Sequence, residues 1–197
     1  PTMGKKGDET REHILAKAES LILERGYAGT SIDDIIKAAG ITKGGFFYHF
    51  EGKNDLACKL MLRYLMQDEA FFNGLIERAA SLTEDPLQQY LIFLKLLAEA
   101  MADLPGTHPG CLVASFTYEA RQFDGDVQKL NAEGVRAWRR IFLEMLERAA
   151  TRYPLRVDRP LEELADMLTS TIEGGIVVSK VLDDAGILPA QLLQYRN

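Results

Sequence analysis

The chain contains few of the features that mark membrane, secreted or disulfide-stabilised proteins. No stretch approaches the roughly 18 apolar residues that a membrane-spanning helix requires. The basic residues near the N-terminus are not followed by an apolar segment, so we expect no secretory signal. There is no Asn-x-Ser/Thr site, and the two cysteines, Cys58 and Cys111, are too few for a disulfide framework. These absences predict a cytoplasmic chain with no membrane partner.

Positive charge is also scarce. The chain has 23 Lys+Arg against 29 Asp+Glu, a formal net charge of −6, which taken alone argues against binding to nucleic acid. The distribution of charge weakens that argument. Residues 1–53 carry eight basic and eight acidic side chains, so the whole excess of negative charge lies after Lys53. If the first 53 residues bind a polyanion, binding would then depend on a few individual Lys or Arg side chains at suitable positions.

The short motifs that mark many enzymes are missing. We find no His-Glu-x-x-His, no phosphate-binding loop, no Gly-x-Ser-x-Gly and no dinucleotide fingerprint. His108 and Cys111 have a zinc-like spacing and could be drawn as a base and a nucleophile. The sequence offers neither a second ligand pair nor an orienting third group for them. We therefore expect no enzymatic activity, no metal and no cofactor.

What the chain does contain is helical periodicity. Apolar residues recur at helical spacing almost everywhere, and no segment shows the alternation of a strand, so the sequence predicts an all-α protein. Three short helices end at about Gly26, Gly40 and Phe50. Longer helices are predicted at about 54–81, 86–103, 111–122, 127–152 and 160–184, with a short one at 189–195. We predict two domains, 1–53 and 54–197.

The signals at residues 31–50 predict a helix-turn-helix. Thr30 and Ser31 are each followed three residues later by an aspartate, which is close to a capping box. Gly40 is a natural helix terminator, and Thr42 can cap the next helix. Gly44 and Gly45 then cost about 1 kcal/mol each in that helix relative to alanine. Their presence is easier to understand if the backbone must approach a partner closely.

The stretch from Tyr27 to Leu56, which includes Thr42-Lys43-Gly44-Gly45-Phe46-Phe47-Tyr48-His49-Phe50, resembles the DNA-binding signature of the tetracycline-repressor (TetR) family. The match begins one helix earlier, at Arg11-Glu12-His13-Ile14-Leu15. The remainder resembles the family only in length and helix layout. The resemblance implies an N-terminal three-helix DNA-binding head and a C-terminal helical bundle for ligand binding and dimerisation.

Carried over residue by residue, the family pattern also implies roles in DNA binding. Hydroxyls at the two helix starts and Lys53 would contact phosphates, Lys43 to Gly45 would face the major groove, and Tyr48 and His49 would touch the DNA backbone. Phe47 stands where many relatives have a tyrosine, so a phenolic contact is either absent or supplied by Tyr48. The DNA-binding residues so implied are Thr30, Ser31, Thr42, Lys43, Gly44, Gly45, Phe47, Tyr48, His49 and Lys53.

The family layout further implies a dimer interface and an effector pocket. The helices predicted at 127–152 and 160–184 suit the interface, with an intramolecular core as the alternative. Interface candidates are Trp138, Met145, Leu168, Ile172, Gly175 and Ile176. Candidates for the pocket are Tyr90, Phe93, Leu97, Met101, Cys111, Phe116, Tyr118 and Trp138. Their character favours an apolar or aromatic effector.

Together these features predict a homodimeric repressor that a small-molecule effector releases from a palindromic double-stranded DNA operator. Effector binding would shift the helix at 54–81 and change the separation of the two reading helices. One alternative is a redox- or electrophile-sensing regulator acting through Cys111, because a helix start stabilises a thiolate. Another is a helical enzyme or interaction module in which the helix-turn-helix is only structural.

Overall fold

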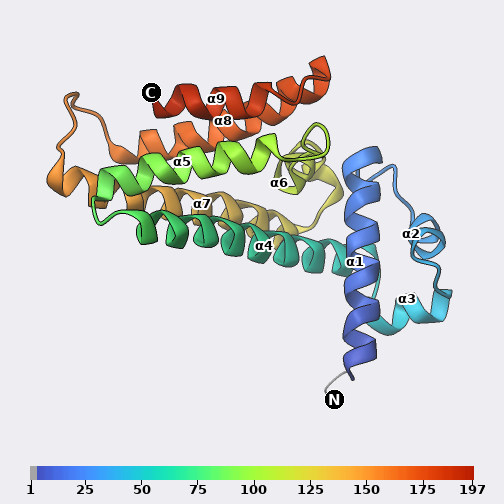
Figure 1. The fold of residues 1–197 in the computed structure, drawn as a ribbon. Helices are drawn as coiled ribbons and strands as arrows, with labels where there is room; N and C mark the ends of the chain where they lie inside the picture. The colour runs from blue at the N-terminus through green and yellow to red at the C-terminus, as the bar shows by residue number, and fades with distance from the viewer. Residues whose placement is uncertain (1–3) are drawn as a thin grey trace. The chain divides into compact units, whose positions relative to one another are not determined.

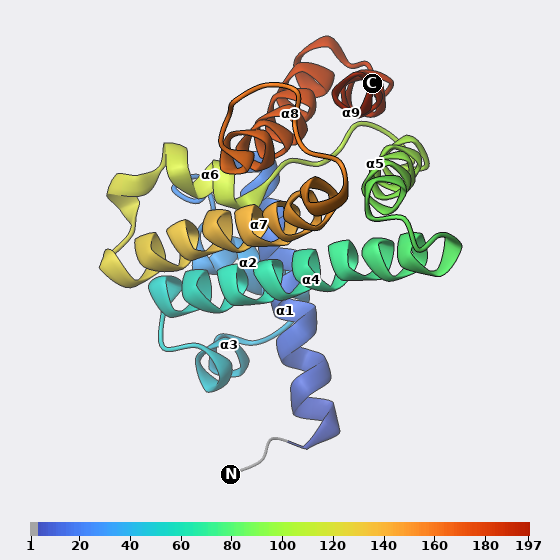
Figure 2. The ribbon, with the colours of Figure 1, turned by 90° about the vertical axis from the view of Figure 1, so that its left-hand side faces the viewer.

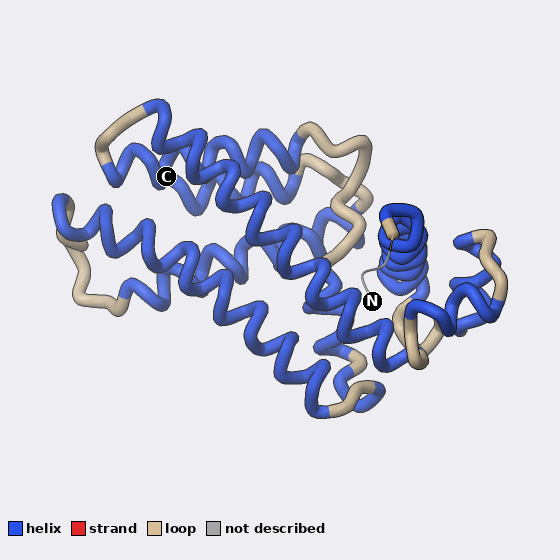
Figure 3. Tube along the Cα trace, turned by 90° about the horizontal axis from the view of Figure 1, so that it is seen from below, coloured by secondary structure: helices blue, strands red, loops and turns tan. Residues whose placement is uncertain are grey.

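The computed structural model describes residues 4–197, and every regular element in that range is helical (Figures 1 and 3). The all-α prediction is confirmed. None of these helices combines the length and the apolarity needed to cross a membrane. The chain forms two compact units, which are described separately below. The first contains the residues up to Leu65 together with Cys111–Glu133, and the second contains Met66–Gly110 and Gly134–Asn197.

The helices follow the predicted order closely. They are α1 (Lys5–Arg25), α2 (Ile32–Ala39), α3 (Lys43–His49), α4 (Lys53–Leu82), α5 (Pro86–Ala102), α6 (Leu112–Tyr118), the short 3₁₀ helix η1 (Ala120–Gln122), α7 (Gly125–Arg152), α8 (Leu161–Leu182) and α9 (Ile187–Arg196). Two predictions are wrong. Helix α1 was expected to be short but has 21 residues, and the single helix expected at 111–122 is divided into α6 and η1. The break is at Glu119, whose backbone leaves the helical region with φ −109° and ψ 26°.

The first unit is built on one apolar face of α1. Ile14, Leu15, Ala18 and Ile22 follow the helical repeat i, i+1, i+4, i+8 and are all buried. Helix α2 packs against α1, and α3 packs against α2 (Figure 1). The guanidinium of Arg63 on α4 reaches Glu12 at 2.6 Å and Glu19 at 3.1 Å, so it joins α4 to α1. Burial is the largest effect on Glu19 and raises the pKa of its carboxyl group.

The start of α2 is fixed by the predicted capping box, and Ser31 is its N-cap. The Ser31 Oγ accepts the Asp34 N–H at 3.0 Å, and the Asp34 carboxylate accepts the Ser31 N–H at 2.9 Å. These hydrogen bonds lower the pKa of Asp34. The helix ends at Gly40, which adopts the left-handed conformation with φ 65° and ψ 36°. Both ends of α2 are therefore set by local sequence.

In the second unit, α9 packs against both α5 and α8 (Figures 1 and 2). Leu188 and Leu192 of α9 are buried. The Tyr195 hydroxyl donates to the Leu164 carbonyl at 2.9 Å and lies 2.6 Å from the Tyr90 hydroxyl. This final helix therefore forms part of the packed core of its unit.

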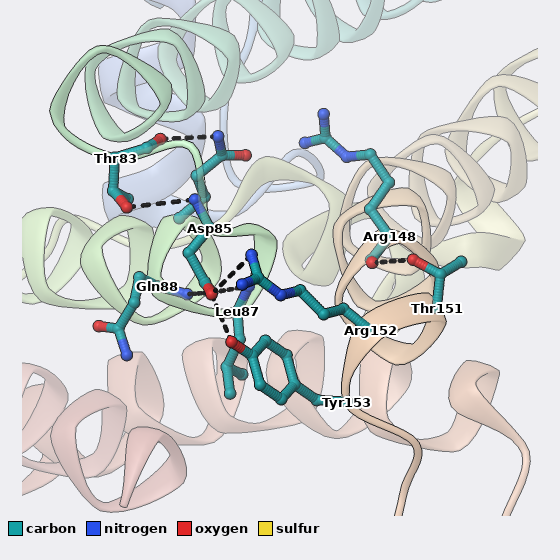
Figure 4. A network of polar contacts seen from close by, with 9 residues as sticks. Thr83, Asp85, Leu87, Gln88, Arg148, Thr151, Arg152 and Tyr153 are labelled. Atoms are coloured by element: carbon teal, nitrogen blue, oxygen red, sulfur yellow. Dashed lines mark hydrogen bonds and ion pairs between the residues drawn. The ribbon is translucent and has the colours of Figure 1, made fainter.

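The start of α5 is held by the polar network in Figure 4. Asp85 caps the helix by accepting the N–H groups of Leu87 at 2.9 Å and Gln88 at 3.0 Å. The same carboxylate accepts the Tyr153 hydroxyl and forms an ion pair with Arg152 at 3.3 Å. These contacts, the Tyr153 hydrogen bond first, lower the pKa of Asp85. The network fastens the end of α7 to the beginning of α5.

The predicted domain boundary at 53 and 54 falls in the first turn of α4 rather than in a linker. Helix α4 is continuous through Leu65, where the first unit gives way to the second. Helix α7 likewise continues past Glu133. The two units are thus covalently joined within two helices as well as at Gly110.

The packing of α3 generates a stability prediction for two adjacent phenylalanines. Phe46 is fully buried, whereas Phe47 is 45% exposed. We expect Phe46→Ala to lower the free energy of unfolding of the first unit by about 3–5 kcal/mol. Phe47→Ala should lower it by less than about 1 kcal/mol. Urea unfolding followed by circular dichroism measures both changes, and equal losses would contradict the placement of Phe46 in the core.

Candidate nucleic-acid interface

The candidate interface is the exposed side of α3 and the residue that precedes it. Thr42, Lys43 and Gly44 are exposed, Phe47 is 45% exposed and Tyr48 is 72% exposed. The opposite side of the helix carries Phe46, which is fully buried. These exposed residues form one surface, whereas two other sequence-predicted residues of this helix, Gly45 and His49, are only partly exposed.

The first turn of α3 is closed by Thr42, whose Oγ1 accepts the Gly45 N–H at 3.0 Å. A Cβ atom at Gly45 would lie 3.3 Å from that oxygen, whereas a Cβ atom at Gly44 would lie 4.0 Å from it, with no other atom as near. Gly45 thus fits tightly beneath its own cap. Gly44 leaves the backbone open on the exposed side, where a partner could approach it.

Two side chains from neighbouring helices contact the C-terminal ends of α2 and α3. His13 on α1 donates from Nε2 to the Ala39 carbonyl at the end of α2, at 3.0 Å. Lys59 on α4 donates to the His49 carbonyl at 3.3 Å, and its ammonium lies 5.4 Å from the centre of the Phe50 ring. Neither role was predicted from the sequence, because each side chain acts on a helix other than its own.

His49 differs from its predicted role at the DNA backbone. The residue is only partly exposed, and its Nδ1 atom is buried. Burial lowers the pKa of the imidazole, and the charges of Arg11 and Lys59 lower it further. The ring therefore does not share the exposure of Tyr48, and we remove His49 from the expected DNA contacts.

Thr30 and Lys53 are also placed differently from expectation. Thr30 is fully buried, and its hydroxyl donates to the Gly26 carbonyl at 2.8 Å, so it has no access to a phosphate. The Lys53 ammonium donates to the Tyr27 carbonyl at 2.6 Å and lies 4.1 Å from the centre of the Tyr27 ring. Burial lowers the pKa of Lys53. We conclude that both side chains hold the loop between α1 and α2.

The residues predicted for an effector pocket are divided between the two units. Cys111, Phe116 and Tyr118 belong to the first unit, where Cys111 and Phe116 are buried and Tyr118 is 84% exposed. A part for these three in an effector pocket stays a prediction. In the second unit, Tyr90, Phe93, Leu97 and Trp138 are buried, and Met101 is partly exposed.

The second unit contains an aromatic cluster that the prediction only partly covered. The Phe93 ring centre lies 6.1 Å from that of Phe142 and 6.3 Å from that of Phe72, and the latter two are 5.2 Å apart. Tyr90 adjoins Phe93, with ring centres 6.4 Å apart. Phe72 and Phe142 were not among the predicted pocket residues.

The predicted dimer-interface residues are mostly buried within the single chain. Buried positions are Trp138, Met145, Leu168, Gly175 and Ile176, whereas Ile172 is partly exposed. Gly175 is small because α9 crosses it: a Cβ atom there would lie 2.7 Å from the Leu188 Cδ1 atom. These five residues are therefore buried without a second chain, and their part in a dimer interface stays a prediction.

The surroundings of His108 and of the two cysteines do not favour a metal site or a reactive thiol. Among residues 4–197, no group of three His, Cys, Asp or Glu side chains is arranged to hold a metal ion. His108 uses its Nδ1 atom to accept the Gly110 N–H at 3.0 Å. The thiol of Cys111 is buried, which limits access by an electrophile, and burial raises the pKa of Cys58.

Two family models and several known proteins are similar to this chain. The family model described as bacterial regulatory proteins, tetR family, matches residues 14–58, and the model of the tetracyclin repressor-like C-terminal domain matches residues 92–190. The chain is 26% identical over 171 residues to the HTH-type transcriptional repressor DhaR of Mycobacterium sp. (strain GP1). That match covers 87% of this chain and 82% of DhaR.

Solved structures agree in fold. A TetR-family transcriptional regulator from Agrobacterium tumefaciens superposes with a TM-score of 0.82 at 25% identity, covering 96% of this chain and 97% of that one. The reduced form of Escherichia coli NemR gives a TM-score of 0.76 at 23% identity, with 95% of each chain covered. The chain therefore belongs to the tetR family of bacterial regulatory proteins, and it is a DNA-binding transcriptional regulator rather than an enzyme.

Proposed function

We propose that the chain is a homodimeric repressor that binds a palindromic operator and is released from it by a small apolar or aromatic effector. The observation that carries this proposal is the exposed face of α3, from Lys43 to Tyr48, supported from beneath by the buried Phe46. Two relatives, DhaR and NemR, are named as repressors. DNA binding in a bacterium also implies a cytoplasmic location.

The DNA contacts follow from the exposed positions. Lys43 and the open backbone at Gly44 would enter the major groove, while Thr42 and Tyr48 would contact the DNA backbone. Ser31, exposed at the start of α2, is a further candidate for a phosphate contact. Because residues 1–53 carry no net charge, we expect the affinity for random DNA to be modest. Most of the binding energy for the operator would then come from specific contacts made by individual side chains.

A second copy of the chain would pack against α8. Gly174, Val177, Val178, Val181 and Leu182 have the spacing of one helical face, which we call the valine face. Val181 is 76% exposed and Leu182 is 64% exposed, and nothing lies within 4 Å of a Cβ atom built at Gly174. An exposed apolar stripe on a helix indicates a protein interface. A two-fold partner would place two α3 helices about 34–36 Å apart, one helical turn of DNA.

The effector would bind in the second unit. Its core holds the rings of Phe72, Phe93 and Phe142, and the paired hydroxyls of Tyr90 and Tyr195 adjoin them. Aromatic side chains with a small number of polar groups suit an apolar or aromatic ligand. Because α4 continues from Lys53 into the second unit, a displacement of this helix would alter the head. Coupling of about 1–3 kcal/mol would lower operator affinity about 5- to 150-fold.

The experiment that tests DNA recognition is selection of tight-binding duplexes from a random pool by the full chain. We expect the selected DNA to contain an inverted repeat, because a two-fold protein reads two equal half-sites. Fluorescence anisotropy then compares the selected duplex with a scrambled one. Failure to enrich any sequence, even at low salt, would contradict the proposed function.

Substitution of Lys43 should reduce sequence discrimination. We expect Lys43→Ala to lower the ratio of affinities for the selected and scrambled duplexes at least about tenfold, because a base contact contributes about 1–3 kcal/mol in each half-site. Lys37→Ala, on the exposed surface of α2, removes the same charge and should leave the ratio close to that of the wild type. An unchanged ratio in Lys43→Ala would show that α3 does not read bases through this residue.

Substitution within the valine face should separate the subunits. Val181→Asp would bury two charges in a two-fold interface, so we expect the dimer to dissociate at least about 100-fold more readily. Val157→Asp is the matched control, because Val157 is 62% exposed in the loop before α8. Sedimentation at micromolar concentration should show dimers for the wild type and the control. Dimers of Val181→Asp, or a monomeric wild type, would contradict this interface.

A further inference from the structure

The loop between α1 and α2 is held by a carboxylate from a distant part of the chain. The Glu119 Oε2 accepts the Tyr27 N–H at 2.7 Å, and the Oε1 accepts the Ala28 N–H at 3.0 Å. Hydrogen bonds to an ionised acceptor are about twice as strong as those between neutral groups. One side chain at the end of α6 therefore satisfies two successive backbone donors of the loop.

Tyr27 of this loop is also held through its backbone carbonyl and its ring. The Lys53 ammonium donates to the Tyr27 carbonyl at 2.6 Å, so Lys53 and Glu119 together engage both backbone polar groups of Tyr27. The Tyr27 ring packs on Phe123, with ring centres 4.3 Å apart, and on Phe116 at 5.9 Å. Burial, with smaller effects from nearby acids including Glu119, raises the pKa of the Tyr27 hydroxyl to about 12.

The backbone before Tyr27 is shaped to receive this carboxylate. Gly26 has a φ of +81°, which a side chain would rarely tolerate, and a Cβ atom there would lie 3.3 Å from both Glu119 oxygens. The Gly26 carbonyl accepts the buried Thr30 hydroxyl at 2.8 Å, and Ser31 follows as the N-cap of α2. The loop runs directly into the first turn of α2, so its position constrains where α2 lies within this unit, and α3 packs on α2.

We propose that Glu119 is a positioning residue for DNA binding, which holds the α1–α2 loop so that α2 and α3 take the conformation that binds DNA. This proposal rests on the DNA-binding role proposed above. Loss of the carboxylate lowers the population of the binding-competent head, and the apparent dissociation constant rises by the same factor. Because α3 itself is unchanged, all duplexes lose affinity equally.

The sign of the effect distinguishes positioning from simple electrostatics. Glu119→Gln removes a negative charge, which by itself would strengthen binding to a polyanion. We expect the opposite, a weakening of about tenfold toward both the selected and the scrambled duplex, because the amide can accept only one of the two N–H groups. Glu24→Gln is the matched control: Glu24 is exposed near the end of α1, and its neutralisation should leave affinity unchanged or increase it.

Hydrogen exchange on the DNA-free chain tests the contact itself. In Glu119→Gln the Tyr27 and Ala28 amides should exchange at least about tenfold faster than in the wild type, with circular dichroism unchanged. Wild-type exchange rates at both amides would overturn the contact. Faster exchange with affinity equal to that of Glu24→Gln would overturn the positioning role.

Two further outcomes of these experiments are also informative. If Glu119→Gln fails to fold, Glu119→Asp replaces it, because the shorter side chain keeps the charge but cannot reach both amides. We expect the same loss of DNA affinity and of amide protection. Wild-type affinity in Glu119→Asp would overturn the proposal. If the wild type selects no duplex, the DNA-recognition proposal fails. The exchange rates at Tyr27 and Ala28 then still decide whether Glu119 holds the loop.

Discussion

The candidate DNA-binding surface depends on the burial of one side of a very short helix. Helix α3 spans seven residues and contains two glycines, and a helix of that length has no stability of its own in water. It persists because Phe46 is fully buried, with its ring centre 5.3 Å from that of Phe50. Every exposed residue of the interface, from Lys43 to Tyr48, is positioned by that packing.

Several charged groups of the first unit make contacts that stabilise its fold. Lys53 and Lys59 donate to backbone carbonyls, Arg63 pairs with two glutamates, and Glu119 accepts two backbone N–H groups. This explains how a head without net charge can still belong to a DNA-binding regulator. Its ions fix the geometry of α2 and α3, so specificity can come from a small exposed set of side chains.

Local signals in the sequence were reliable because they act within a few residues. The capping box at Ser31, the left-handed Gly40 and the cap at Thr42 were all predicted and are all observed. Partners distant in the chain were not predictable in this way. Thr30 and Ser31 look equivalent in sequence, yet Thr30 is buried against Gly26 and Ser31 is exposed. Gly175 was predicted to lie at a dimer interface, whereas its missing side chain accommodates Leu188 of the same chain.

The sequence by itself therefore determined the all-α class, the order of the helices and the helix-turn-helix, since periodicity, caps and glycines are properties of short segments. Only the tertiary structure decided which side of each helix is buried and which distant groups meet. It assigned Trp138 and Met145 to the core, exposed Val181, and brought Glu119 to the amides of Tyr27 and Ala28. The physical reason is that a helical repeat identifies an apolar face, whereas the partner that covers this face is set by packing between elements far apart in the chain.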